Sequence, residues 1–304
     1  MPTTILQPGQ IEAGASAIPE LRLPTANQFV ERARRFEQLA EGHKLGDWLR
    51  FLAALCRAQH DALPLLAQAP LPDADLLQRC RDYAMPPLAP PGWRRDPTWR
   101  AALRAIAGAV IESAPAVARN ALRDLQAAPD DWLDVQADRL LAAEVRGLDL
   151  SCSPIIGAAL QTSWSALAGR LRPADIARPE HPNLCPVCGS RPAAAVVRIG
   201  GAENGLRYLH CGLCSSEWHV VRAKCSHCDN GQGIAYLSIA GGDETVRAET
   251  CPACHGYLKQ VHQDRDPQAE PLADDLASLA LDILVGEEGF AKTGMNLLLV
   301  NVEG

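Results

Sequence analysis

Residues 183–262 read NLCPVCGSRPAAAVVRIGGAENGLRYLHCGLCSSEWHVVRAKCSHCDNGQGIAYLSIAGGDETVRAETCPACHGYLKQVH. This segment contains four Cys-X-X-Cys pairs, which account for eight of the eleven cysteines in the 304-residue chain. The pairs are Cys185/Cys188, Cys211/Cys214, Cys225/Cys228 and Cys251/Cys254. A two-residue gap lets a tight turn place two sulfurs at one edge of a metal tetrahedron, with backbone N–H groups directed at the thiolates. Four such pairs so close together predict metal binding.

The pairs also repeat, because the third and fourth pairs follow the first and second at an offset of 40 residues. Each copy contains a Cys-X-X-Cys turn (a knuckle), an apolar stretch, a Gly-containing turn, a second strand and a second knuckle. This order predicts a β-hairpin with a knuckle at either end. We therefore expect two four-cysteine ribbons, the first over 183–222 and the second over 223–262.

The repeat favours sequential pairing of the knuckles. Site one then contains Cys185, Cys188, Cys211 and Cys214, and site two contains Cys225, Cys228, Cys251 and Cys254. A cross-braced arrangement, in which the first and third knuckles share a metal, stays open. Tetrahedral thiolate sites suit both zinc and iron, and the spacing does not distinguish these metals. Six of the eight histidines lie in 181–262, but four sulfurs already complete each site, so we expect none of them to be a ligand.

Other uses of paired cysteines fit less well. A thioredoxin-like dithiol needs a helix N-terminus in a βαβ context, and no such pattern surrounds these pairs. A 4Fe–4S cluster often uses three closely spaced cysteines with a distant fourth. The single cysteines, Cys56, Cys80 and Cys152, lie in apolar helical contexts and are expected to be buried thiols.

The rest of the chain predicts helices before the ribbons. Residues 1–24 lack periodicity and are expected to form an irregular arm. Apolar residues recur at helical spacing over 25–172, which predicts a bundle of amphipathic helices, and 173–182 forms a Pro-containing linker. The segment 263–304 is acidic and carries a predicted helix at about 271–285. A solvated face is the favoured role for its charge, and a recognition surface is the alternative. The fold class is therefore α+β, with an all-α N-terminal bundle, two tandem ribbons and a C-terminal helix.

Composition and charge exclude several functions. The chain is 47% apolar and 21% charged, as in ordinary globular proteins. The sequence contains no run of about eighteen apolar residues, so it predicts no membrane span. The N-terminus also has no secretory signal pattern, and we therefore expect a cytoplasmic protein. The net charge of −7 comes from 263–304, which carries two basic and nine acidic residues. No basic stripe follows the chain, so no nucleic-acid partner is expected.

No catalytic constellation is evident, and we do not expect an enzyme. Between the two ribbons lie Trp218, His219, Arg222 and Lys224, which form either a contact patch or part of the packing. Self-association stays open.

Several motifs together resemble one family. They are LCPVCGSRP at 184–192, GLRYLHCGLCSSEWHVVRAKCSHCD at 205–229, AETCPACHGYLK at 248–259, and EPLADDLASLALDIL at 270–284 followed by EEGF. This pattern, which covers about 183–290, resembles the formate dehydrogenase accessory protein (FdhE) family. The resemblance implies a non-catalytic assembly factor that acts in the cytoplasm on the catalytic subunit of respiratory formate dehydrogenase. It also implies rubredoxin-like modules in which the eight paired cysteines bind two metal ions, with iron favoured and zinc the alternative.

Two rival hypotheses remain. A rubredoxin-like electron-transfer protein or thiol oxidoreductase would require a metal or dithiol that cycles between redox states. The second rival is a nucleic-acid-binding zinc-ribbon protein. Each four-thiolate site with a divalent metal would carry a charge of about −2, which argues against binding to phosphate backbones.

Overall fold

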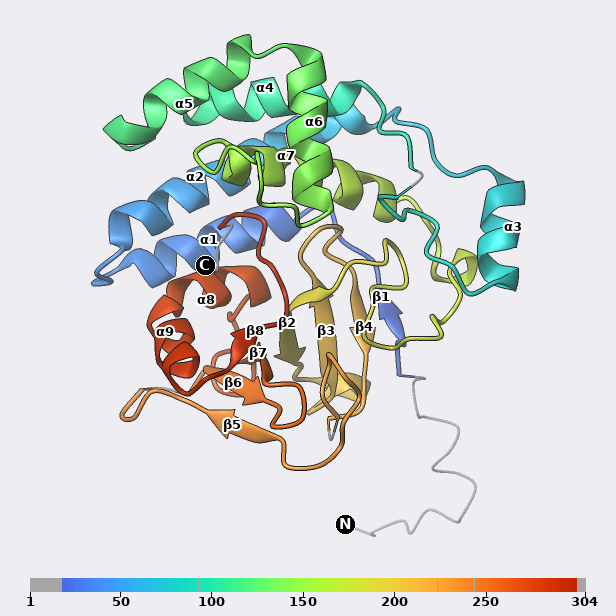
Figure 1. Ribbon diagram of the computed structural model, residues 1–304, viewed down its shortest axis with the longest axis vertical. Coiled ribbons are helices and arrows are strands. Elements are labelled where there is room, and N and C mark those ends of the chain that lie inside the picture. The colour runs from blue at the N-terminus through green and yellow to red at the C-terminus, as the bar shows by residue number, and fades with distance from the viewer. Residues whose placement is uncertain (1–17, 92, 223, 243, 300–304) are drawn as a thin grey trace, which may run out of the picture.

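The computed structural model describes residues 18–91, 93–222, 224–242 and 244–299 (Figure 1). The predicted α+β class is confirmed: the N-terminal helices form the upper part of Figure 1, and a sheet lies below them. The bundle helices are α1 (Gln28–Ala40), α2 (Gly46–Ala62), α3 (Ala74–Asp82), α4 (Thr98–Val110), α5 (Ala116–Ala127), α6 (Asp130–Leu141) and α7 (Ser153–Ala168). Short 3₁₀ helices occur at Leu63–Leu66, Pro173–Asp175 and Gly201–Glu203. Over the described ranges, no helix combines the length and hydropathy needed to cross a bilayer.

The helices form where apolar residues recur at helical spacing. On α1, Phe29, Ala33, Phe36 and Ala40 lie on one face and are almost completely buried. α7 differs because nearly all of its side chains are buried, as expected for a helix in the centre of a bundle. It packs against α2, α4 and α6.

The described strands form one sheet in the order β1-β4-β3-β2-β7-β6-β5, with β8 also paired to β7. The strands are β1 (Leu21–Arg22), β2 (Pro192–Val197), β3 (Arg207–Cys211), β4 (Glu217–His219), β5 (Ala235–Leu237), β6 (Val246–Thr250), β7 (Gly256–His262) and β8 (Ala291–Lys292). Each ribbon therefore contributes three antiparallel strands, where the sequence predicted a two-stranded hairpin. The second knuckle of each ribbon reverses the chain like a hairpin loop and returns a third strand, β4 or β7.

The two ribbons join into one continuous sheet. Strand β2 of the first ribbon pairs in parallel with β7 of the second, with Ala195 opposite Gln260. A buried ion pair between Arg207 and Glu249 also links the ribbons, with 2.7 Å between Nη2 and Oε1. The tandem repeat is thus a single structural unit.

The N-terminal arm takes part in this sheet. Residues 1–17 lie outside the described residues, but Leu21–Arg22 form β1, which pairs with β4. The Tyr208 hydroxyl donates to the Pro19 carbonyl at 2.8 Å. The end of the predicted irregular arm is therefore an edge strand.

The C-terminal segment differs from its prediction in two ways. The helix expected at about 271–285 is divided into α8 (Pro271–Ala277) and α9 (Leu279–Glu287). The Ser278 hydroxyl donates to the Asp274 carbonyl at 2.7 Å, and such back-bonding bends helices. Asp274 and Asp275 are also buried, not on a solvated face, because α8 packs between α1 and strands β2 and β7.

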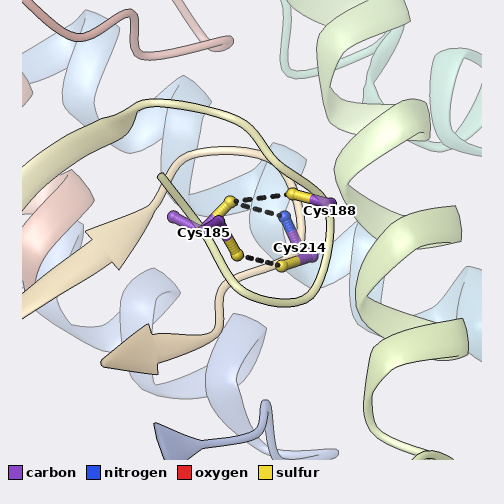
Figure 2. Close-up of side chains that lie close together, drawn as sticks. Cys185, Cys188 and Cys214 are labelled. Carbon is purple, nitrogen blue, oxygen red and sulfur yellow. Dashed lines mark hydrogen bonds between the residues drawn. The ribbon is translucent and has the colours of Figure 1, made fainter. Parts of the chain in front are cut away.

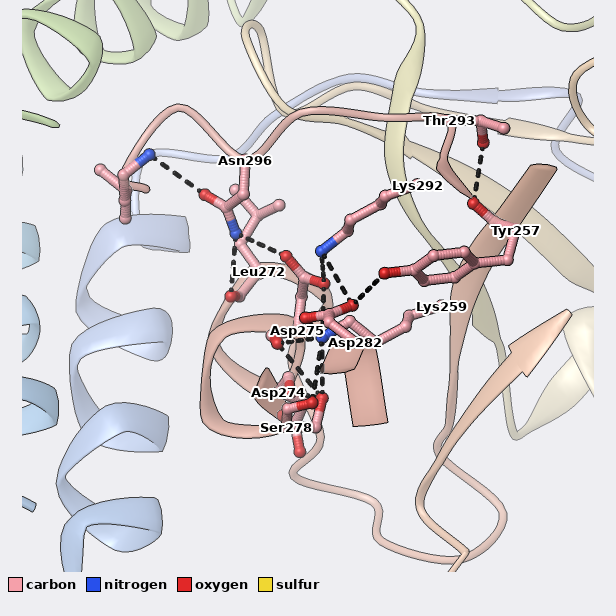
Figure 3. A network of polar contacts seen from close by, with 11 residues as sticks. Tyr257, Lys259, Leu272, Asp274, Asp275, Ser278, Asp282, Lys292, Thr293 and Asn296 are labelled. Carbon is pink, nitrogen blue, oxygen red and sulfur yellow. Dashed lines mark hydrogen bonds and ion pairs between the residues drawn. The ribbon is translucent and has the colours of Figure 1, made fainter. Parts of the chain in front are cut away.

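Each of these buried carboxylates has cationic partners. Asp274 accepts two hydrogen bonds from Arg35 of α1, at 2.8 and 2.6 Å. An Asp275 oxygen lies 3.0 Å from Nζ of Lys259 and 2.5 Å from Nζ of Lys292 (Figure 3). The lysines also pair with Asp282, which accepts from the Tyr257 hydroxyl at 2.8 Å. This ion cluster (Lys259, Asp275, Asp282 and Lys292) fastens α8 and α9 to the sheet.

The apolar core is divided unequally between the ribbons. One large core includes the helices, all four cysteines of the first ribbon, and Leu297 and Leu298 near the C-terminus. A small second core contains Ala248, Tyr257, Leu281 and Val285. The first ribbon is therefore part of the bundle's core, whereas the second contributes Leu258 to the large core and Ala248 and Tyr257 to the small core that it shares with α9.

Candidate metal centres

The first ribbon brings four sulfurs together beneath the helices. Sγ of Cys185 lies 3.5 Å from that of Cys214, and Sγ of Cys188 lies 3.4 Å from that of Cys211 (Figure 2). All four sulfurs lie within 4.8 Å of one another. Each of these residues is at most 1% exposed.

The second ribbon repeats this arrangement nearer the surface. Sγ of Cys225 lies 3.8 Å from that of Cys254, and Sγ of Cys228 lies 3.7 Å from that of Cys251. In both ribbons the first cysteine meets the fourth and the second meets the third, so the grouping is sequential and not cross-braced. Cys228 is exposed and Cys254 is half-buried.

The sulfur spacing fits a tetrahedral metal. A metal–sulfur bond of about 2.3 Å implies an edge of about 3.8 Å between sulfurs. A disulfide would require a separation of about 2.05 Å, and all of the cysteines are free. The donor set is four thiols, which suits zinc or iron. Each group could therefore hold one metal ion, and the geometry does not identify which metal.

All four knuckles have the same backbone geometry. The residue after each second cysteine is left-handed, with φ of 74° at Gly189, 56° at Ser215, 61° at Asp229 and 52° at His255. The backbone N–H of each first cysteine donates to the carbonyl five residues later, at 2.8–2.9 Å. Three of the four left-handed residues carry a side chain, which is uncommon and marks a locally constrained turn. The knuckles are thus preformed by the backbone.

Sequence reasoning missed the residues that support the sulfurs. The Ser190 and Ser216 hydroxyls lie 3.4 and 3.2 Å from Sγ of Cys188 and Cys214, and the Asn230 amide lies 3.6 Å from Sγ of Cys251. Each of these residues stands two positions after the second cysteine of a knuckle. That regular position was the signal that could have identified them.

Backbone N–H groups also stabilise the thiolates. Leu213 and Cys214 each donate to Sγ of Cys211 at 3.4 Å, as the two-residue gap predicts. Burial raises the pKa of Cys225 to about 12. Burial also tends to raise the pKa of Cys251, but hydrogen bonds, led by those from the backbone N–H groups of Cys254 and Ala253, together have the larger, opposite effect, so the resulting pKa is about 6. A cation within each group would offset the cost of ionising the remaining thiols.

The other candidate residues lie outside the two four-sulfur groups. The described histidines belong to neither four-sulfur group: for example, Nδ1 of His210 lies 3.0 Å from Oε1 of Glu217, and the His219 ring packs edge-on against Tyr208. Trp218 is buried, and its indole N–H donates to the Pro182 carbonyl at 2.8 Å. It serves the packing and not a surface patch. Cys56, Cys80 and Cys152 are buried, and burial raises the pKa of Cys56 to about 12.

The difference in burial predicts unequal metal release. When the metal-loaded protein is mixed with excess chelator, site two is expected to lose its metal at least about tenfold faster, because Cys228 is exposed and local opening of its ribbon involves mainly the small core. The loss can be followed with a chromogenic chelator, where two phases of equal amplitude are expected. A single phase for both metals would contradict the difference. The Cys228→Ser variant identifies the fast phase as site two, because only the slow phase should remain.

Comparison with known proteins shows relatives for nearly the whole length of this chain. Three family models match: "FdhE, N-terminal" over residues 18–180, "FdhE, central domain" over 184–222 and "FdhE, C-terminal domain" over 223–299. A protein of Pseudomonas aeruginosa described as a "Protein FdhE homolog" is 44% identical over 98% of both chains. A "Protein FdhE" of Salmonella paratyphi B is 38% identical over 95% of this chain and 94% of that protein.

A solved structure shares the fold. The crystal structure of the FdhE protein from Pseudomonas aeruginosa superposes with a TM-score of 0.80 at 40% sequence identity. The similarity covers 94% of this chain and all of the crystallised chain.

Proposed function

This chain belongs to the FdhE family, and from that premise we propose that it is an accessory protein for respiratory formate dehydrogenase. It binds the catalytic subunit of that enzyme in the cytoplasm while the subunit is being assembled. It has no catalytic activity of its own. The observation that carries the proposal is the pair of preformed four-thiol groups in a chain related to FdhE proteins along nearly its whole length.

We assign the metal ligands to the eight paired cysteines. Cys185, Cys188, Cys211 and Cys214 hold one ion, and Cys225, Cys228, Cys251 and Cys254 hold the other. Iron, which we favour, would supply one-electron chemistry, whereas zinc would stabilise the ribbons only. The chain itself orients the thiolates through its knuckle turns and excludes water from site one.

Client binding is tested by co-purification. The full chain, purified anaerobically at low salt with its metal retained, is expected to recover the catalytic subunit from cells that express formate dehydrogenase. A chain with Cys228→Ser and Cys254→Ser keeps the large core and is the matched variant, which is expected to recover less of the subunit. Failure of the unsubstituted chain to recover the catalytic subunit would contradict the proposal.

Exposure of site two favours a second candidate, electron transfer with the client. Cys228 is exposed, so a partner could approach the metal closely there, whereas site one is fully buried. Metal analysis and visible absorption of protein from its native host distinguish electron transfer from a purely structural role of the metal. Two irons with ferric–tetrathiolate bands would keep electron transfer open, and two zincs in a colourless protein would remove it.

A further inference from the structure

A cavity that contains none of the metal ligands lies beside the first ribbon. The cavity, of about 410 Å³, is lined by α1, residues 22–25 around β1, parts of β3 and β4, and residues 267–271 before α8. Its volume is in the range of small-molecule sites. Arginines are frequent in its lining: Arg22, Arg32, Arg34, Arg35 and Arg198.

Arg32 is one of the residues that line this cavity. Its side chain is 0% exposed, and its Nε donates to Oε1 of Glu270 at 2.9 Å. Nη1 and Nη2 are both buried and have no hydrogen-bond partner among the described residues. A buried guanidinium with two unpaired donor groups is costly, and its free edge has the shape that binds an oxyanion through two parallel hydrogen bonds.

A second element contributes an unpaired nitrogen. His210, which is 5% exposed, faces Glu217 through Nδ1, whereas its buried Nε2 has no partner within the described part of the chain. Arg32 lies on α1 and His210 lies on β3, so two separate elements contribute unpaired nitrogens to the cavity.

The unpaired donor groups of the lining indicate the ligand. Five arginines face three glutamates, Glu31, Glu217 and Glu270. Four of the arginines are already paired with carboxylates, three of which lie outside the lining: Arg22 with Glu203, Arg32 with Glu270, Arg35 with Asp266 and Asp274, and Arg198 with Glu217. Arg34 is exposed with no ion pair among the described residues. The donor groups left without a carboxylate are therefore the Arg34 guanidinium, Nη1 and Nη2 of Arg32, and Nε2 of His210. A phosphate monoester has three acceptor oxygens and a charge of about −1.5 to −2 near neutral pH, so it can accept from several of these groups at once, whereas a carboxylate has only two oxygens.

We propose that this cavity binds the phosphoryl group of a small phosphorylated molecule, held by Nη1 and Nη2 of Arg32 with Arg34 at the rim. The cavity is larger than a free phosphate requires, so the rest of the ligand occupies the remaining volume. This site is independent of the proposed client and of the metal.

Calorimetric titration of the full metal-loaded chain, in buffer free of phosphate and sulfate, tests the proposal. The probes are orthophosphate, pyrophosphate and AMP, with succinate as a dianion that carries carboxylates only. We expect saturable one-to-one binding of pyrophosphate or AMP, weaker binding of orthophosphate, and no binding of succinate at the same concentration. Binding of orthophosphate as tightly as AMP would overturn the inference that the site takes a larger molecule.

Three variants locate the binding. Arg32→Gln is expected to weaken binding roughly tenfold or more, because two charge-assisted hydrogen bonds are lost. Arg34→Gln is expected to weaken it about threefold without harm to the fold, because Arg34 is exposed. Arg50→Gln, on α2 and paired with Asp47, is the control and should bind as the unsubstituted chain does.

The contrary outcomes are equally definite. No saturable binding of any phosphorylated probe, equal binding of succinate, or unchanged affinity in Arg34→Gln and Arg32→Gln would each overturn the proposal. If Arg32→Gln does not fold, Arg34→Gln alone decides the location. Client recovery is measured separately, so a failure here leaves the accessory function standing.

Discussion

Replacement of Asp275 by Asn is expected to lower the free energy of unfolding by about 3–5 kcal/mol. Asp275 is 0% exposed and lies within ion-pair distance of Lys259 and Lys292 (Figure 3). The substitution would leave two largely buried lysines with Asp282 as their remaining carboxylate. It would also weaken the hydrogen bond from the Asn296 amide, which lies 3.0 Å from Asp275 Oδ2. Urea unfolding of the metal-loaded protein, followed by circular dichroism, measures the loss.

The pH dependence identifies the cause of this loss. Burial alone would raise the pKa of Asp275, but Lys259 and Lys292 lower it to about 2. A carboxyl with a lowered folded-state pKa stabilises the protein above its ordinary pKa of about 3.9, and this contribution disappears as the pH falls toward 2. The difference in stability between the Asn variant and the unsubstituted chain should therefore shrink between pH 4 and 2 (about the ordinary and folded-state pKa values).

A matched control makes the same substitution at an exposed carboxylate, which shows whether the loss of stability depends on the buried position of Asp275. Asp61→Asn, at an exposed position on α2, should change the stability by less than about 0.5 kcal/mol. A deficit for Asp275→Asn below 1 kcal/mol (about the value of a surface ion pair) would contradict the role given to the ion cluster. So would a deficit that stays constant down to pH 2 (about the folded-state pKa).

Replacement of Cys211 by Ser is expected to destabilise the helical bundle together with its own ribbon. From the sequence alone, each ligand substitution should affect its own ribbon most, because metal affinity is part of the folding energy of such modules. The structure changes this expectation for site one, whose four cysteines lie in the same core as the helices. We expect Cys211→Ser to lower the midpoint of helical melting by about 10 °C or more.

The corresponding change at site two should act locally. Cys228 is exposed and lies outside both apolar cores, so Cys228→Ser should shift the helical melting midpoint by only a few degrees, roughly 1–3 °C. Cys80→Ser removes a thiol that belongs to neither four-sulfur group and controls for the loss of a thiol as such. Equal shifts for Cys211→Ser and Cys228→Ser, measured at 222 nm on metal-loaded protein, would refute the difference between the sites.

The sequence by itself determined the class of fold and the eight cysteines that make up the two four-cysteine groups. Both are governed by short-range rules. Helical spacing at Phe29, Ala33 and Phe36 predicts a buried helix face whatever it packs against. A Cys-X-X-Cys turn places its two sulfurs through local backbone geometry, and the repeat of 40 residues favours sequential pairing of the turns, which the structure confirms.

Only the tertiary structure decided how these parts meet. The parallel pairing of β2 with β7 and the pairing of Arg35 with Asp274 join residues that are 65 and 239 positions apart, and site one is buried in the same core as the helices. Charges and apolar residues in a sequence do not identify their distant partners, so Asp274 and Asp275 resembled an ordinary solvated helix turn. Their burial, and the unpaired nitrogens of Arg32, arise because α8 is packed between α1 and the sheet.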